Sequence, residues 1–359
     1  MKYKNLLAPI KIGNLKLKNR IVLPPMVIWK SDKSGMVTKS HLEHYKESTG
    51  CGLSIVEAAV VSPEGRLSDK QLGIFNDQQI RGLSKIADVI HQNGGAAGIQ
   101  LHHAGGKATT RTTFGETPLV VSKEAVSQSK ICRELSTDDI NRILNDFTEG
   151  ARRAVEAGFD YIEFHGAHGY LGTQFLSPLL NKRNDKYGGT LENRQRFLLE
   201  SFEKISAEVK GKAVVSCRLG VADKKPGGIS IEEGINTACR LEEAGMQILN
   251  ISCGNGYPDS VKPTGSSFKG LYHLAEQIKK HVLIPVIGVG GLVTPEQAEL
   301  ALENNMSDLT AVGKAFLADP GWAQKVLEGR ADEINYCRQC NVCHQFSNPD
   351  RCPVWIQFR

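Results

Sequence analysis

The stretch YIEFHGAHGY, residues 161–170, decides the fold, because a buried strand ends there in a cluster of polar side chains. Its first four residues are mainly apolar and aromatic, as is typical of a strand. Glycines then allow a sharp turn and the close approach of a ligand. His165, His168 and Tyr170 form a compact set of donors, which can hold an anionic or carbonyl oxygen and deliver a proton. The alternative is a turn whose histidines are only polar surface residues.

Short apolar runs like this one alternate with helical patterns along almost the whole chain. We predict eight strands, at residues 20–26, 53–61, 97–102, 161–165, 213–219, 248–252, 285–290 and 309–313. Helix patterns lie between them, at 139–157 with Thr137 as N-cap, at 230–244 and at 294–304. Eight strands alternating with helices over roughly 300 residues predict an α/β fold, the (β/α)8 TIM barrel. A doubly wound sheet is the alternative, but it requires a glycine-rich turn after the first strand, which the residues Pro24-Pro25-Met26 do not provide.

Length and composition predict a globular protein with one large domain. The chain has 359 residues, of which 40% are hydrophobic and 23% charged. We expect the barrel at residues 1–330 and a short Cys-rich tail at 331–359, with a small hairpin or lid in the loop 104–135. The net charge is +5 with dispersed basic residues, which argues against nucleic-acid binding. Neither a long apolar run nor a signal-peptide pattern is visible, so no membrane partner and a cytoplasmic location are expected.

Chemistry in such barrels sits at the carboxyl ends of the strands. Glycines close predicted strands seven and eight at Gly290, Gly291 and Gly313, and Lys314 follows the last of them. Backbone N–H groups there predict a phosphate site, unless the glycines serve tight turns alone.

The other strand ends complete a site that suits flavin mononucleotide. The Gln100 amide can pair with the donor and acceptor edge of the pyrimidine ring. Arg218 can stabilise negative charge near flavin N1, and Ala58 offers a small surface beside the ring. We expect the flavin contacts to come from the strand ends and not from the tail. The predicted cofactor-binding residues are Pro24, Pro25, Met26, Val27, Ala58, Gln100, Arg218, Ser252, Gly290, Gly291, Gly313 and Lys314.

These motifs resemble the Old Yellow Enzyme family of flavin-dependent ene-reductases, from about residue 5 to 320. The similar segments are LKNRIV at 17–22, QLHHAG at 100–105, HGAHGYL at 165–171, FLSP at 175–178 and DKYGG at 185–189. The resemblance implies FMN, reduction by NAD(P)H and hydride transfer to the β-carbon of an activated alkene. It also implies that His165 and His168 hold the substrate oxygen and that Tyr170 protonates the α-carbon.

Three residues depart from the family pattern. Val27 stands where many relatives have Cys or Thr, which removes a hydrogen-bond donor to the flavin. Trp29 stands where a tyrosine often lines the substrate pocket, so we expect Trp29 to bind substrate in a more apolar site. Lys314 replaces the usual Arg of the phosphate loop, which keeps the charge but not the bidentate fork.

Four of the nine cysteines crowd the last part of the chain. Cys337, Cys340 and Cys343 form C-x2-C-x2-C, and Cys352 follows. The segment resembles the iron–sulfur segment of the trimethylamine dehydrogenase and 2,4-dienoyl-CoA reductase group. It implies a [4Fe–4S] cluster that receives electrons from a partner protein. A zinc site, with four cysteines or with three and His344, and free thiols are the alternatives. The further dinucleotide-binding domain of those relatives is expected to be absent.

Two other functions stay open. An amine dehydrogenase-like or partner-coupled enoate or dienoyl reductase is one, although an aromatic cage for a cationic amine is not evident in the sequence. A non-enzymatic redox or metal-sensing module is the other, and the histidine–tyrosine set argues against it. The sequence identifies neither the alkene nor the choice between NADH and NADPH. It is compatible with a homo-oligomer without fixing one.

Overall fold

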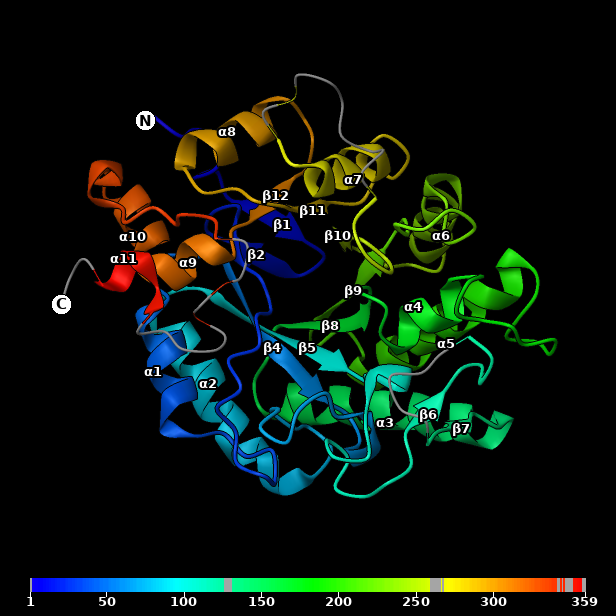
Figure 1. Cartoon of the computed structure of the whole chain (residues 1–359). Coiled ribbons are helices and arrows are strands. Elements are labelled where there is room, and N and C mark those ends of the chain that lie inside the picture. Colours follow the sequence, from blue (N-terminus) through cyan, green and yellow to red (C-terminus); the bar gives the residue numbers. More distant parts are fainter. Residues whose placement is uncertain are drawn as a thin grey trace.

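Eight parallel strands form a closed barrel at the centre of the molecule. The computed structural model describes residues 2–125, 131–258, 266, 268–340, 343, 345 and 351–356. The barrel order is β10-β11-β12-β3-β4-β5-β8-β9, and Figure 1 looks into it. The strands are β3 (Ile21–Leu23), β4 (Leu53–Val60), β5 (Ala96–His102), β8 (Tyr161–Gly166), β9 (Val214–Gly220), β10 (Leu249–Ser252), β11 (Val286–Val289) and β12 (Leu309–Ala311). The predicted barrel is therefore confirmed, and the doubly wound sheet is excluded.

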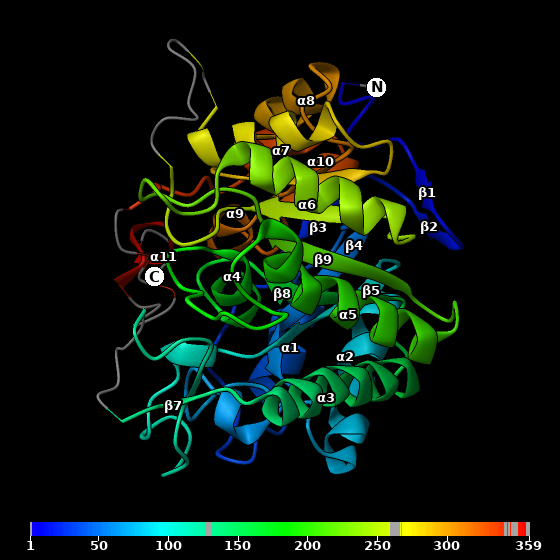
Figure 2. The same cartoon turned by 90° about the vertical axis from the view of Figure 1, so that its right-hand side faces the viewer.

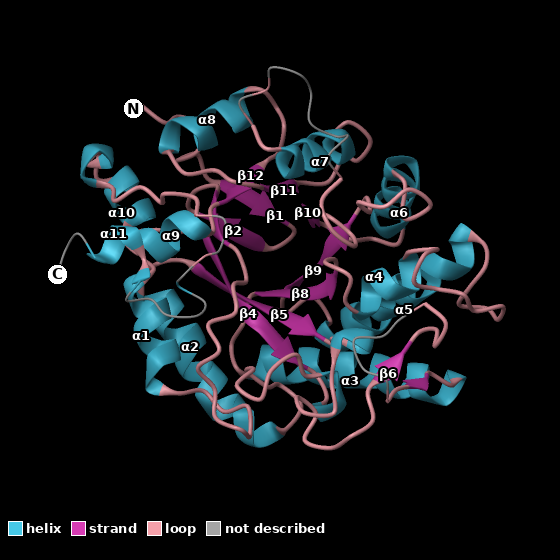
Figure 3. Ribbon diagram, viewed as in Figure 1, coloured by secondary structure: helices cyan, strands magenta, loops and turns pink. Residues whose placement is uncertain are grey.

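Helices surround the barrel, as Figures 2 and 3 show. They are α1 (Lys39–Glu47), α2 (Ile80–Gln92), α3 (Thr137–Glu156), α4 (Leu171–Leu176), α5 (Leu191–Val209), α6 (Ile231–Glu243), α7 (Gly270–Lys279), α8 (Pro295–Glu303), α9 (Lys314–Ala318), α10 (Trp322–Leu327) and α11 (Pro353–Ile356). The predicted N-cap of α3 was wrong by one residue. Ser136, not Thr137, caps it, because its hydroxyl accepts the Asp139 amide at 3.1 Å in a capping box. Within the described residues, no helix combines the length and apolarity that crossing a membrane requires.

Two short sheets lie outside the barrel. β1 (Ile10–Ile12) and β2 (Leu15–Leu17) form an antiparallel hairpin that the sequence patterns did not predict. Its Ile12 and Leu17 belong to the same buried cluster as the first residues of several barrel strands, so the hairpin closes the amino-terminal end of the barrel. β6 (Leu119–Val120) and β7 (Arg133–Glu134) pair in parallel within the loop 104–135. The hairpin predicted for that loop was therefore wrong, although the loop does carry a small sheet.

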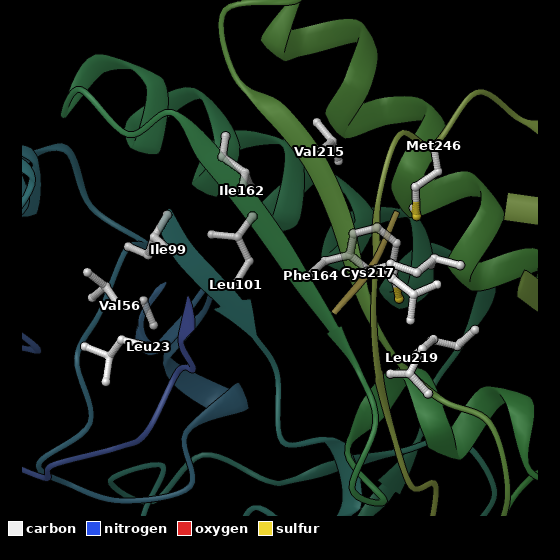
Figure 4. Close-up of a cluster of buried hydrophobic side chains, with 14 of the residues drawn as sticks. Leu23, Val56, Ile99, Leu101, Ile162, Phe164, Val215, Cys217, Leu219 and Met246 are labelled. Carbon is white, nitrogen blue, oxygen red and sulfur yellow. The ribbon is translucent and has the colours of Figure 1, made fainter. Parts of the chain in front are cut away.

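The main core fills the layer between strands and helices. Figure 4 shows outward-facing strand residues such as Val56, Ile99, Leu101, Ile162 and Phe164 within this layer. Side chains alternate between the two faces of a strand, so their neighbours point into the barrel. Apolar neighbours near the strand starts fill its lower interior, and polar neighbours near the strand ends leave a hollow above it.

Candidate active site

A cavity of about 400 Å³ opens at the carboxyl ends of the barrel strands. Every residue predicted to be catalytic or to bind the cofactor lines it, from strand ends far apart in the sequence. These residues are Pro24, Pro25, Met26, Val27, Ala58, Gln100, His165, His168, Tyr170, Arg218, Ser252, Gly290, Gly291, Gly313 and Lys314. Closure of the barrel is what collects them, because parallel strands end at one rim.

Trp29 is the exception among the predicted residues. It does not line the cavity, where the loop after β3 contributes only as far as Val27. The backbone turns at Trp29, whose φ is 54°. The amide just before it, that of Ile28, donates to the buried Glu57 carboxylate at 3.2 Å. This bond fixes the backbone one residue before Trp29, and the role of Trp29 in substrate binding stays a prediction.

The histidine pair is held by a chain of hydrogen bonds. The Ala167 amide donates to Nδ1 of His165 at 3.2 Å, which places the proton of that ring on Nε2. This Nε2 lies 3.2 Å from Nδ1 of His168. The backbone of His168 is left-handed, with φ 61°, and its amide donates to the Cys253 carbonyl at 3.0 Å. The turn therefore fixes the second ring against the first.

Ser252 contacts the histidine pair directly. Its Oγ lies 2.7 Å from Nε2 of His168. Since Nε2 of His165 donates to Nδ1 of His168, the proton of a neutral His168 ring lies on Nε2, which donates to the Ser252 hydroxyl oxygen. Ser252 was predicted only as a cofactor contact, and its position on His168 was not foreseen.

Burial keeps both histidines neutral. It lowers the pKa of His165 and of His168 well below the ordinary value, and the nearby cations Arg218 and Lys107 act in the same direction. Neutral imidazoles act as hydrogen-bond donors without carrying a charge into the cavity.

Tyr170 lies beside the pair with its proton retained. Its ring centroid is 5.0 Å from that of His165 and 4.6 Å from that of His102. Burial raises the pKa of the Tyr170 phenol. Lys107 contacts two residues of the turn that follows β8. Its Nζ lies 4.8 Å from the Tyr170 ring centroid and donates to the His168 carbonyl at 2.6 Å.

Polar side chains on neighbouring strands fix Gln100 in the cavity wall. The Gln100 amide donates to Glu163 at 2.6 Å, which orients its carbonyl oxygen and second N–H. Glu163 is fully buried and also accepts from Asn250 at 2.8 Å. Burial raises the pKa of the Glu163 carboxyl, although Arg218 and these bonds oppose the shift.

Arg218 is a buried cation that lacks a paired carboxylate. Among the residues that the structure describes, none places a carboxylate within ion-pair distance of it, and its Nε has no hydrogen-bond partner. A buried charge of this kind needs an anionic or strongly polar partner. Because Arg218 lines the cavity, that partner is expected to be a ligand.

The opposite side of the cavity combines glycines with two lysines. Gly290 and Gly291 have φ of 152° and 71°, a backbone that disfavours side chains. Lys314 lines the cavity there, and so does Lys269, which the sequence patterns did not identify. The Lys269 side chain lies against Gly291, at 2.4 Å from where a Cβ would stand. Neither lysine forms an ion pair within the described part of the chain. The arrangement is suited to a phosphate.

Several further residues were missed by sequence reasoning. His102, Gln71 and Tyr257 line the cavity, as does Gln339 from the Cys-rich segment. His102 belongs to the QLHHAG motif, and its position at a strand end was the available signal. Gln71 donates both to Nδ1 of His102 at 3.1 Å and to the Ala58 carbonyl at 2.9 Å. It comes from a loop, which no periodicity identifies.

The four tail cysteines line a second, much smaller cavity of about 20 Å³. Cys337, Cys340, Cys343 and Cys352 share it with Lys314. Among the described residues, however, no three His, Cys, Asp or Glu side chains are arranged to hold a metal ion. His344, the alternative zinc ligand, lies outside the described residues. The cysteines are thus gathered at one place without forming a metal-binding geometry.

We predict that the free energy of unfolding falls as the pH is lowered from about 6.5 towards 4. Burial lowers the pKa of His102 to about 3 and those of His44 and His103 to about 4. Below pH 6.5 the unfolded chain takes up protons that these histidines, and also His165 and His168, do not bind in the folded state, so acid favours unfolding. Each unit of pKa difference corresponds to about 1.4 kcal/mol. The pKa of Asp146, raised by burial to about 6, opposes only part of this effect.

Urea unfolding at pH 7, 6 and 5 measures the effect. His281→Gln is the matched control, since the His281 side chain is exposed, and the substitution should leave the pH profile unchanged. An unfolding free energy that stays constant between pH 7 and 5 would contradict the prediction.

Comparisons with known proteins agree with this geometry. The family model described as NADH:flavin oxidoreductase / NADH oxidase family matches residues 5–333. The NADH oxidase of Thermoanaerobacter brockii is 39% identical over 346 residues, which are 95% of this chain and 53% of that protein. The chain therefore spans about half the length of this curated relative.

Two solved structures have the same fold. The 2-naphthoyl-CoA reductase in complex with 2-naphthoyl-CoA superposes with a TM-score of 0.88 at 28% identity, over 98% of this chain and 58% of that one. The Old Yellow Enzyme homologue from Zymomonas mobilis superposes with a TM-score of 0.82 at 27% identity, over 95% and 96% of the two chains.

Proposed function

From the premise that this chain belongs to the NADH:flavin oxidoreductase / NADH oxidase family, we propose that it is an FMN-dependent ene-reductase. It takes hydride from NAD(P)H and reduces the C=C bond of an activated alkene, such as an α,β-unsaturated carbonyl. One observation carries the proposal. The hydrogen-bonded pair His165–His168 and the Tyr170 phenol share one cavity with the unpaired Arg218.

The residues present fit FMN. Gln100 and Arg218 would hold the polar edge of the flavin ring, where the orphaned Nε of Arg218 requires a partner. Gly290, Gly291, Gly313, Lys314 and Lys269 would hold the phosphate. Pro24, Pro25, Met26, Val27 and Ala58 complete the wall. Bound FMN supplies the hydride chemistry, with NAD(P)H as the source of the hydride and the alkene β-carbon as its acceptor.

The histidine pair would bind the substrate oxygen. Nε2 of His165 carries a proton, and once a substrate oxygen separates the rings, a Ser252 hydroxyl that donates to Nε2 of His168 would leave a proton on Nδ1 of His168. A carbonyl or nitro oxygen between the rings would receive both bonds and replace their mutual contact. Negative charge grows on that oxygen as the alkene is reduced, so the two donors stabilise the transition state more than the ground state.

Tyr170 would deliver the proton. Its raised pKa means that the phenol keeps its proton at neutral pH and releases it only to a strongly basic carbon. Lys107, close to the Tyr170 ring, favours the phenolate that remains after transfer. Amine oxidation is less well supported, because the lining aromatics, Tyr170 and Tyr257 besides the histidines, do not suggest a cage for a cation.

Stopped-flow spectroscopy tests the function. Flavin-loaded protein mixed with NADH or NADPH without oxygen should lose its flavin absorbance, and 2-cyclohexenone should then restore it. Failure of the enone to reoxidise the reduced protein, while oxygen does so, would contradict alkene reduction and leave an NADH oxidase.

For the segment 331–359 we propose an iron–sulfur site. The support is that four cysteines with C-x2-C-x2-C spacing line one cavity beside Lys314. Thiolates are the ligands that such clusters use. A [4Fe–4S] cluster there would let a partner protein supply electrons to the flavin.

We predict about four iron atoms per chain in protein purified without oxygen. Cys340→Ser should remove this iron, because it deletes one ligand of the set. Cys239→Ser is the control, since Cys239 is a half-buried thiol on α6 and should leave the iron content unchanged. Elemental analysis decides between the alternatives. One zinc and no iron per chain would identify a structural zinc site, and no metal would mean that the cysteines are free thiols.

A further inference from the structure

The Cys-rich segment reaches into the main cavity. Gln339 stands between Cys337 and Cys340, which line the small cavity, yet Gln339 itself lines the large one. The sequence suggested that the flavin contacts come from the strand ends alone, and Gln339 does not fit that expectation. One short turn therefore faces both cavities.

The backbone at Gln339 is unusual. Its φ of 52° is left-handed, a conformation that side-chain-bearing residues disfavour. Its amide donates to Sγ of Cys337 at 3.4 Å. Lys210 and Asn305 have similar φ values, but each lies at the end of a helix, where such a residue commonly terminates it. His168, also left-handed, lines the cavity as Gln339 does. Trp29 and Phe114 are left-handed as well and do not line the cavity, so it is the position of Gln339 in the cavity wall, together with its φ, that supports a functional constraint.

The turn is anchored to the phosphate side of the cavity. Lys314, the first residue of α9, lines both cavities. Nε1 of Trp355 donates to the Leu317 carbonyl at 3.1 Å, which ties α11 to α9. Ala318 of α9 packs with Cys352 and Val354, and Cys337 packs against this cluster. Figures 1 and 2 both place α11 beside α9. Gln339 thus lines the same cavity as Lys314, from a turn whose two cysteines share the small cavity with that lysine.

We propose that Gln339 is a cofactor-binding residue that holds the phosphate of FMN together with Lys314 and Lys269. The proposal rests on the FMN-dependent function above. The two lysines match the charge of a phosphate, and the neutral amide adds directed N–H donors. The Cys337–Cys340 turn is thereby part of the flavin site.

Flavin titration of the apoprotein tests this inference without any turnover. Flavin-free protein is titrated with FMN and, separately, with riboflavin, which lacks the phosphate, and quenching of flavin fluorescence gives each Kd. Gln339→Gly removes the amide and tolerates the left-handed backbone. It should weaken FMN binding roughly tenfold and leave riboflavin binding unchanged. Gln339→Glu, nearly isosteric but anionic, should weaken FMN binding further, again without affecting riboflavin.

Lys210→Gly is the matched control, since it introduces glycine at a left-handed position away from the cavity. Its Kd values should equal those of the wild type. The apoprotein melting temperature of Gln339→Gly should not fall, which separates loss of a contact from misfolding. An unchanged FMN Kd in both Gln339 variants would overturn the proposal, and so would equal losses for FMN and riboflavin. A wild-type protein that binds neither flavin would instead overturn the proposed function itself.

Discussion

Replacement of Tyr170 by phenylalanine is expected to slow the reduction of an enone by on the order of 10²–10⁴-fold, the range typical of a lost general acid. The phenol would supply the proton for the α-carbon, and its pKa, raised by burial, keeps that proton available at neutral pH. Phenylalanine preserves the ring contacts with His165 and His102 but has no proton to give. Reoxidation of the reduced flavin by 2-cyclohexenone in stopped-flow experiments measures the effect.

A quinone provides the control for Tyr170→Phe within the same protein. Quinone reduction requires no proton on carbon, so the rate should change little. If both substrates slow equally, Tyr170 acts in binding or packing, and its role as an acid would have to be abandoned.

Removal of the histidine pair is the second large effect that we expect. His165→Ala and His168→Ala each delete one donor to the substrate oxygen, and loss of one such donor typically slows the chemical step by about 10²–10³-fold. Binding of a phenolic ligand, measured from its charge-transfer absorbance with the flavin, should weaken in both variants. Reduction by NADH should be affected less than reoxidation by the enone.

Two comparisons give this experiment its specificity. Ser252→Ala should weaken phenol binding less than either alanine variant, because it removes the group that orients His168 and not a donor itself. His91→Ala, at an exposed histidine on α2, should behave as wild type. Unchanged reoxidation rates in both His165→Ala and His168→Ala would contradict the assignment of the pair.

The local pattern of the sequence was sufficient for the barrel. A buried parallel strand reads as a short apolar run, and eight such runs separated by helices have few alternative arrangements. The same pattern identified the strand ends, and the residues chosen there, from Pro24 to Lys314, all line the cavity. The hairpin β1–β2 was missed, because its two three-residue strands are too short for a periodicity to appear.

The tertiary structure decided which side chains touch. His168 and Ser252 are 84 positions apart, and no pattern reveals that the serine hydroxyl contacts Nε2 of that imidazole. Trp29 follows a cavity-lining loop in sequence but is not among the residues that line the cavity, whereas Lys269 and Gln339 enter it from segments without strand signals. The physical reason is that periodicity reports burial along one segment. Contacts between segments depend on barrel closure, on loop backbone angles and on which charges remain unpaired, and these exist only in the folded chain.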